Sequence, residues 1–347
     1  MEKQYFSKTD RLNDVVIIRS LAIVMVVAFH AYYMILVPAH FPNSQAMYHD
    51  MYYTINCITL QFRMPLFIMI SGYLFSHLEN DRGKYTTFKG LFKNKFKRLI
   101  IPFYVFASVF MLTINDFSWK PYYSWGYQHL WFITMLFWCF IVTRILSFLP
   151  FSRNIWFKTF VLVLFFILNL LPRLDFSFLA VPNLLRWYFW FYFGYQLYLN
   201  RNKIYGFIDH NKIMALSILI ALTLICIGYK SLVIIDDSVH TWYGELGNIT
   251  ISILIWYTTN YLIFNKSLKG GGALDWLNKY SYGIYVFHNW LQPFMISTTA
   301  IALFHLDVLA MEYPILFPLA FFVSSFIISL ALSWLLLKTR VGKFLIG

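Results

Sequence analysis

The chain has 347 residues, of which 60% are hydrophobic, 21% aromatic and 12% charged, and its formal net charge is +13. A soluble domain carries about 25% charged residues, so this composition excludes a soluble globular enzyme and a disordered chain. What it indicates instead is an all-α integral membrane protein that crosses the bilayer several times.

Ten apolar runs approach the length of about 20 residues that a membrane-crossing helix needs. They lie at 15–37, 56–77, 99–114, 130–149, 155–172, 184–200, 213–229, 247–264, 281–301 and 315–337. The first run contains Arg19 and has no small-residue cleavage site after it, so we expect a span and not a cleaved signal peptide. The pattern predicts a bundle of about ten transmembrane helices. We expect one domain over residues 1–347, without a fused extracytoplasmic domain.

The basic residues are distributed unevenly among the predicted loops. If Arg144, Lys158 and Arg186, which lie near run ends, are counted with the loops beside them, 22 of the 28 Lys and Arg lie in the termini and in the loops after the second, fourth, sixth and eighth runs, 4 lie in the other loops, and Arg19 and Arg63 lie inside runs. Cytoplasmic loops are enriched in Lys and Arg. The distribution therefore predicts that both termini are cytoplasmic, and it explains the net charge without nucleic acid as a partner.

Ionisable side chains are rare inside the predicted spans. Every Asp and Glu falls in a loop or at the end of a run, which argues against an ion-coupled transporter with a carboxylate relay. Apart from groups near the run ends, the Arg, Lys and His side chains within the spans are Arg19, His30, Arg63 and His288. Such groups are costly in a bilayer and are candidates for function.

Arg19 and His30 lie on one face of the first predicted helix. Eleven steps of 100° bring them nearly into register, about 16 Å apart along the helix axis. Arg19 would lie about one turn above the cytoplasmic boundary, and His30 in the outer half of the membrane. Two simpler interpretations stay open: Arg19 can extend to the inner interface, and His30 can be a neutral ring bonded to a backbone carbonyl.

Arg63 is expected to lie at about the same depth as His30. The second predicted helix runs inward from the outer face, and Arg63 lies about 10 Å into it. An Arg stays charged and needs an anionic or polar partner there. Pro65 follows it and is expected to disturb the helix ladder, which frees backbone groups.

The sequence offers no metal site. It has no HxxxH motif, no cluster of His with carboxylates and no CxxC pair. Cys57, Cys139 and Cys226 lie in or beside apolar runs and are expected to be free thiols. By its position alone, His288 is expected to be a packed, hydrogen-bonded interior residue.

Five segments resemble, in the same order, the acyltransferase family 3 of membrane enzymes. They are RSLAIVMVVAFH (19–30), PLFIMISGYLF (65–75), KNKFKRLIIPFY (93–104), HLWFI (129–133) and YSYGIYVFH (280–288). The first carries the Arg-x10-His spacing of the family's first helix. The third departs from the family's frequent Arg-x-x-Arg, because it has Lys95 and Arg98 at these positions.

The resemblance implies an O-acyltransferase that moves acetyl from cytosolic acetyl-CoA to a hydroxyl of a cell-surface glycan or a lipid-linked sugar precursor. It implies catalytic roles for His30 and Arg63, and acetyl-CoA binding by Arg19, Lys95 and Arg98. The candidates for substrate binding within the matching segments are Ser71, His129, Trp131, Tyr285 and His288.

Further expectations follow for partners and location. The chain is expected in the plasma (inner) membrane, with the lipid bilayer and a carbohydrate acceptor as partners and without a metal. The ten aromatic-rich spans also suit a non-enzymatic carrier or flippase for glycolipids or polysaccharides, or a structural membrane subunit. Dependence on an acyl donor and on His30 distinguishes the enzyme from both alternatives.

Overall fold

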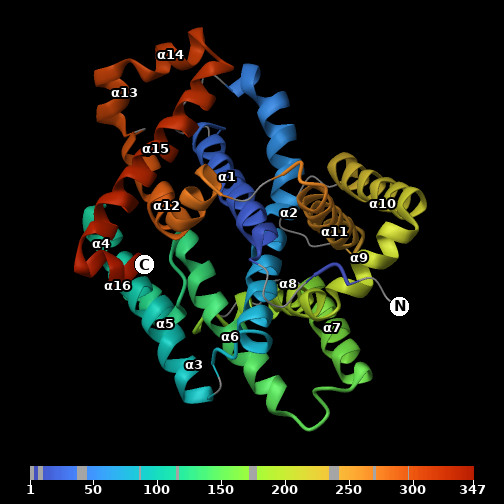
Figure 1. Ribbon diagram of the computed structural model, residues 1–347. Coiled ribbons are helices and arrows are strands. Elements are labelled where there is room, and N and C mark those ends of the chain that lie inside the picture. Colours follow the sequence, from blue (N-terminus) through green and yellow to red (C-terminus); the bar gives the residue numbers. More distant parts are fainter. Residues whose placement is uncertain are drawn as a thin grey trace. The chain divides into compact units, whose positions relative to one another are not determined.

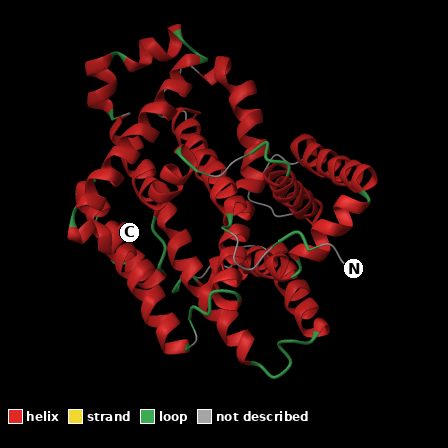
Figure 2. Ribbon diagram, viewed as in Figure 1, coloured by secondary structure: helices red, strands yellow, loops and turns green. Residues whose placement is uncertain are grey.

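The computed structural model describes residues 4–6, 11–36, 45–85, 87–114, 117–171, 178–233, 242–268, 271–295 and 297–347. Every regular element in these ranges is a helix, and none is a strand (Figure 2). The predicted all-α fold is therefore confirmed for this part of the chain.

Among the described residues, ten long helices overlap the ten apolar runs, one each (Figure 1). They are α1 (Asn13–Leu36), α2 (Gln45–Asn80), α4 (Ile101–Thr113), α6 (Trp131–Phe148), α7 (Ile155–Leu170), α8 (Val181–Leu199), α10 (Lys212–Val233), α11 (Trp242–Phe264), α12 (Ala273–Met295) and α15 (Leu316–Lys338). Shorter elements lie between or after them: α3 (Phe88–Lys95), the π-helix η1 (Phe96–Ile100), α5 (Lys120–Ser124), the 3-10 turn η2 (Gln128–Leu130), α9 (Arg201–His210), α13 (Thr298–Phe304), α14 (Leu306–Glu312) and α16 (Arg340–Ile346).

One local expectation about the helices is wrong. The run at 281–301 is not one helix, because α12 ends at Met295 and α13 begins after Ser297, whose side chain accepts a hydrogen bond from the backbone N–H of Ala300. Pro293, in the last turn of α12, removes a backbone donor there. Conversely, α2 runs unbroken through Pro65.

Length and hydropathy admit four described segments as membrane spans: Asn13–Tyr33, Phe88–Thr113, Lys120–Phe148 and Leu316–Lys338. A fifth is possible if Arg201–His210 and Lys212–Cys226, bent by 103°, form one broken span. These apolar helices mark a membrane protein. Other long helices bury polar side chains that lower their hydropathy, such as those of α11 and α12.

The chain divides into two compact units. Unit 1 comprises residues 1–18 and 65–269, and unit 2 comprises residues 19–64 and 270–347. Both divisions fall inside helices, in α1 after Ile18 and in α2 after Met64. Each of these two helices therefore contributes residues to both units.

In unit 1, glycines allow α2 and α8 to approach closely. A Cβ atom on Gly72 would overlap the carbonyl oxygen of Phe191, and one on Gly194 would overlap that of Met69. Small residues at such crossings let helix backbones touch. The contact fixes the part of α2 that follows Pro65 against α8.

Replacing Gly72 by alanine is expected to destabilise unit 1 by about 1–3 kcal/mol, because the new methyl group must push two backbones apart. Gly228→Ala is the matched control, since Gly228 is also helical and has open space around it. The measurement is the thermal unfolding of the two purified variants in detergent. Equal unfolding temperatures would contradict the close crossing.

In unit 2, α12 packs along α15. Gly283 faces the side chain of Ser333, and the Gln292 amide donates to the Ser325 hydroxyl at 3.1 Å. Ser325, Ser329 and Ser333 are fully buried and repeat every four residues, so one face of α15 is small and polar. This pairing holds the segment of α12 that carries His288.

Candidate functional site

Unit 2 places two histidines side by side, His30 on α1 and His288 on α12. The His288 Nε2 atom lies 3.1 Å from His30 Nδ1, and the two ring centroids are 4.9 Å apart. His30 Nδ1 also lies 2.9 Å from the carbonyl oxygen of Val26, one turn earlier on α1. His288 is fully buried, and His30 is partly buried.

The contacts of the two rings determine which nitrogen carries the proton. His288 Nδ1 lies 3.0 Å from the carbonyl oxygen of Ile284, and a carbonyl only accepts hydrogen bonds. In a neutral His288 the proton is therefore on Nδ1, and Nε2 is an acceptor. His30 Nδ1 then faces two acceptors, the Val26 carbonyl oxygen and His288 Nε2. The proton of a neutral His30 is therefore on Nδ1, and the lone pair is on Nε2.

This tautomer of His30 is the one that a general base requires. The partners of Nδ1 fix the orientation of the ring, while Nε2 holds the lone pair that can accept a proton from a hydroxyl. When Nε2 takes the proton, the Nδ1–H donates from a charged ring, and hydrogen bonds to charged groups are stronger. His288 and the Val26 carbonyl then stabilise the imidazolium.

Arg63 lies close to this pair, in the segment of α2 that belongs to unit 2. Its guanidinium carbon is 3.3 Å from the centroid of the Phe29 ring, and Phe29 packs edge-on against His30 with centroids 5.1 Å apart. The Arg63 side chain is 4% exposed. The structure thus brings Arg63 to the residue that precedes His30.

Tyr285 also reaches this site, whereas Arg19 lies farther along α1. The Tyr285 ring centroid is 5.9 Å from that of His288, within unit 2. Arg19 is half-buried, and the rise of α1 places it about 16 Å from His30 along the helix. Of the predicted site residues, unit 2 therefore gathers His30, His288, Arg63 and Tyr285.

The other substrate-binding candidates belong to unit 1. The Ser71 hydroxyl donates to the carbonyl oxygen of Phe67 at 2.9 Å, within α2. His129 is buried and stacks on Phe110, with centroids 6.2 Å apart. Trp131 stacks on Trp187 at 5.9 Å. Their described contacts are those of packed helices, and their roles in substrate binding stay predictions.

Lys95 and Arg98 have different surroundings at the start of the predicted third span. The Lys95 ammonium lies 3.4 Å from the ring centroid of Phe140, 5.0 Å from that of Tyr85 and 5.9 Å from that of Phe75, a set of cation–π contacts. Arg98 is exposed on the π-helix η1. Of the two predicted phosphate ligands, Arg98 is the more accessible to a ligand from the solvent.

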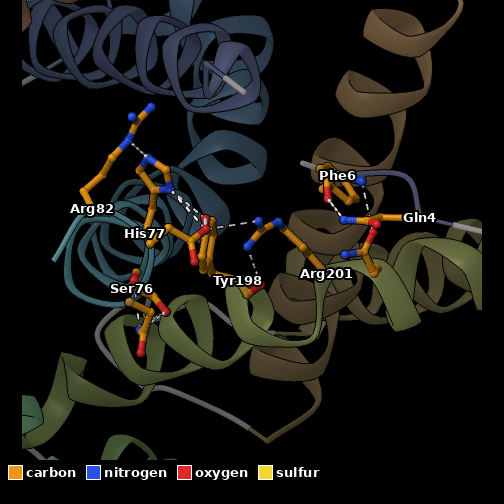
Figure 3. A network of polar contacts seen from close by, with 10 residues as sticks. Gln4, Phe6, Ser76, His77, Arg82, Tyr198 and Arg201 are labelled. Carbon is orange, nitrogen blue, oxygen red and sulfur yellow. Dashed lines mark hydrogen bonds and ion pairs between the residues drawn. The ribbon is translucent and has the colours of Figure 1, made fainter. Parts of the chain in front are cut away.

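Unit 1 also contains a polar network that the sequence reasoning missed (Figure 3). The Tyr198 hydroxyl donates to Asp81 and lies 2.6 Å from His77 Nδ1, and Arg201 Nη2 lies 3.4 Å from the same carboxylate. Burial would raise the pKa of Asp81, but the contacts with Tyr198 and Arg201 outweigh it and lower that pKa. The spacing of His77 and Asp81, one helical turn apart, was the signal available in the sequence.

Within the described ranges, no group of three or more His, Cys, Asp or Glu side chains is placed to hold a metal ion. Cys139 and Cys226 are free and buried. The side chain of Cys57 lies outside the described residues.

The chain belongs to a family of acyltransferases. A family model described as "Acyltransferase domain", that of acyltransferase family 3, matches residues 13–338. The match runs through both units and includes the helices that carry His30, Arg63 and His288. No curated protein and no solved structure matches the chain.

Proposed function

We propose that the chain is an integral membrane O-acetyltransferase, which transfers acetyl from cytosolic acetyl-CoA to a hydroxyl of a cell-surface glycan or a lipid-linked sugar precursor. Membership of the acyltransferase family supports acyl transfer. The observation that carries the proposal is the hydrogen bond between His30 and His288, which supports a role of His30 as a base. We place the protein in the plasma membrane with ten spans and cytoplasmic termini, as the distribution of Lys and Arg indicates.

In the proposed reaction, His30 Nε2 removes the proton of the acceptor hydroxyl as its oxygen attacks the thioester carbonyl carbon. The tetrahedral intermediate then collapses, and the carbon–sulfur bond breaks. The imidazolium of His30 returns the proton to the leaving thiolate, so the products are the acetyl ester and the free thiol. A second route, in which His30 itself carries the acetyl group, uses the same lone pair.

Three basic residues complete the proposal. Arg63 stabilises the negative charge that develops on the carbonyl oxygen. Arg19 and Arg98 bind the anionic head group of the donor, and Lys95 joins them once its ammonium leaves the aromatic rings. Ser71, His129, Trp131 and Tyr285 are proposed to bind the acceptor.

The proposed function is tested by measuring the transfer of a labelled acetyl group from acetyl-CoA to a glycan. Membranes that contain the chain, and matched membranes without it, receive acetyl-CoA labelled in the acetyl group together with a polysaccharide or lipid-linked glycan. Label in the glycan that base treatment releases, and that depends on the chain, is the expected result. Movement of an unmodified glycolipid across the bilayer without a donor would instead identify a carrier.

His288 is expected to act by positioning His30. His288→Ala removes one acceptor of the Nδ1–H, and a hydrogen bond to a charged group contributes about 1.5–3 kcal/mol, so kcat is expected to fall about 10–100-fold with little change in KM. His288→Gln, whose amide oxygen can accept the same proton, is expected to recover part of the rate. Equal rates for the Ala and Gln variants would contradict this role.

A further inference from the structure

Unit 1 encloses a cavity of about 310 Å³ that the His30–His288 pair does not line. Its walls come from the N-terminal segment, the start of α1, the first residue of α9 and the end of α11. Small-molecule pockets measure about 300–1,000 Å³, so the volume suits one small ligand. No role described above uses this cavity.

One wall of the cavity carries a buried and incompletely paired cation, Arg201. Its side chain is 9% exposed. Nη1 donates to the carbonyl oxygen of Tyr198 at 3.1 Å, and Nη2 lies 3.4 Å from Asp81. Its Nε is buried and has no hydrogen-bond partner among the described residues. Figure 3 shows this side chain between Tyr198 and the segment that carries Phe6. A buried donor of this kind requires an acceptor, because leaving it unpaired is costly.

The cavity also presents groups of the opposite polarity. Asp14 is 3% exposed, and its carboxylate accepts a hydrogen bond from the Asn260 amide at 3.4 Å. The side-chain oxygen of Asn13 is buried and has no partner in the described part of the chain. Both residues line the cavity. Asp14 also accepts a hydrogen bond from the backbone N–H of Val15 at 2.8 Å, so the groups left to satisfy need an anionic end for Arg201 and an N–H donor for Asn13.

The remaining lining is largely apolar. Phe6, Leu12, Ile263 and Phe264 form part of the walls, and aromatic side chains such as these favour a flat ring as the body of the ligand. Arg11 adds a second guanidinium to the lining. A planar base with N–H donors on its edge, joined to a phosphate, combines all of these features.

We propose that this cavity binds a purine nucleotide, with its phosphate at Arg201 and Arg11 and the N–H edge of the base at Asn13. The nucleotide has two possible sources with the same chemistry: a free nucleoside phosphate, or the adenosine phosphate end of the acyl donor. The site stands on its own lining and does not depend on the transfer reaction.

The experiment measures equilibrium binding of ADP, GDP and UDP to the purified full-length chain, without an acceptor. Ile263→Trp fills the cavity and is expected to weaken binding of the preferred purine nucleotide at least tenfold. Leu262→Trp adds the same bulk at the neighbouring position, which does not line the cavity, and is expected to leave binding unchanged. Arg201→Lys keeps the positive charge but lacks the Nε donor, so a similar loss of nucleotide affinity is expected. Its control is Lys203→Ala, because Lys203 lies on the exposed side of α9.

Every outcome of this experiment either supports or overturns the proposed nucleotide site. If a purine nucleotide binds and both Ile263→Trp and Arg201→Lys weaken its binding, the site is supported. Displacement of bound ADP by CoA then assigns the site to the acyl donor. ADP binding that CoA does not displace assigns the site to a free nucleotide. The proposal would be overturned if none of the three nucleotides binds, if UDP binds as tightly as ADP and GDP, or if Ile263→Trp does not change the affinity. The cavity would then be occupied by water. Because no acetyl transfer is measured, a failure of the proposed function would not alter these readouts.

Discussion

His30→Ala is expected to lower acetyl transfer by about 10²–10⁴-fold, the usual contribution of a general base. The variant removes the only lone pair that the hydrogen bonds of Val26 and His288 prepare for proton transfer. Folding should be retained, since His30 is only partly buried. The measurement is the initial rate of label transfer from acetyl-CoA in membranes with equal amounts of the two proteins.

His210→Ala is the matched control, because His210 is an exposed histidine at the end of α9. We expect it to retain the wild-type rate. Equal rates for the wild type and His30→Ala would exclude His30 from the mechanism. Label that stays on the wild-type protein after denaturation, and is absent from His30→Ala, would show that the acetyl group passes through His30.

Arg63→Gln is expected to lower kcat by about 10²–10³-fold, the cost of losing one donor to a developing oxyanion. The amide keeps a hydrogen-bond donor but loses the fixed charge and the contact with Phe29. KM for acetyl-CoA should change little, because the interaction forms in the transition state. Steady-state rates over a range of donor concentrations separate the two parameters.

Two further variants test the role of the Arg63 charge. Arg63→Lys restores the charge without the planar guanidinium and is expected to recover part of the rate. Arg153→Gln removes an exposed arginine between α6 and α7 and should not change the rate. If KM for acetyl-CoA rises while kcat stays at the wild-type value, Arg63 contributes to donor binding and not to oxyanion stabilisation.

The helices were predictable because their signal is local. A long helix overlaps each apolar run, as expected for apolar segments that must satisfy their own backbone groups within a bilayer. The one error concerns the run that contains Pro293: α12 ends two residues after this proline, whereas α2 continues past Pro65. Tertiary packing, which hydropathy does not contain, decides between them.

The candidate site was predictable as a set of residues but not as a geometry. Arg63 and His30 were expected at one depth because helix rise is regular, and the structure places Arg63 against Phe29. The sequence allowed a backbone carbonyl as a partner of His30, and Val26 supplies it. The second partner, His288, is 258 positions away along the chain. Contacts at such separation depend on how α12 and α1 pack. For the same reason, the contacts of Lys95 with aromatic rings could not be predicted from the sequence.

The choice of an imidazole, and not a carboxylate, as the second partner of His30 has an electrostatic consequence. A carboxylate would hold a permanent negative charge in a region from which lipid excludes water, and its solvation would be lost at all times. Two neutral rings satisfy each other's hydrogen bonds without any ion at rest. In the proposed reaction, the two rings then carry charge only during the short interval in which a proton is in transit.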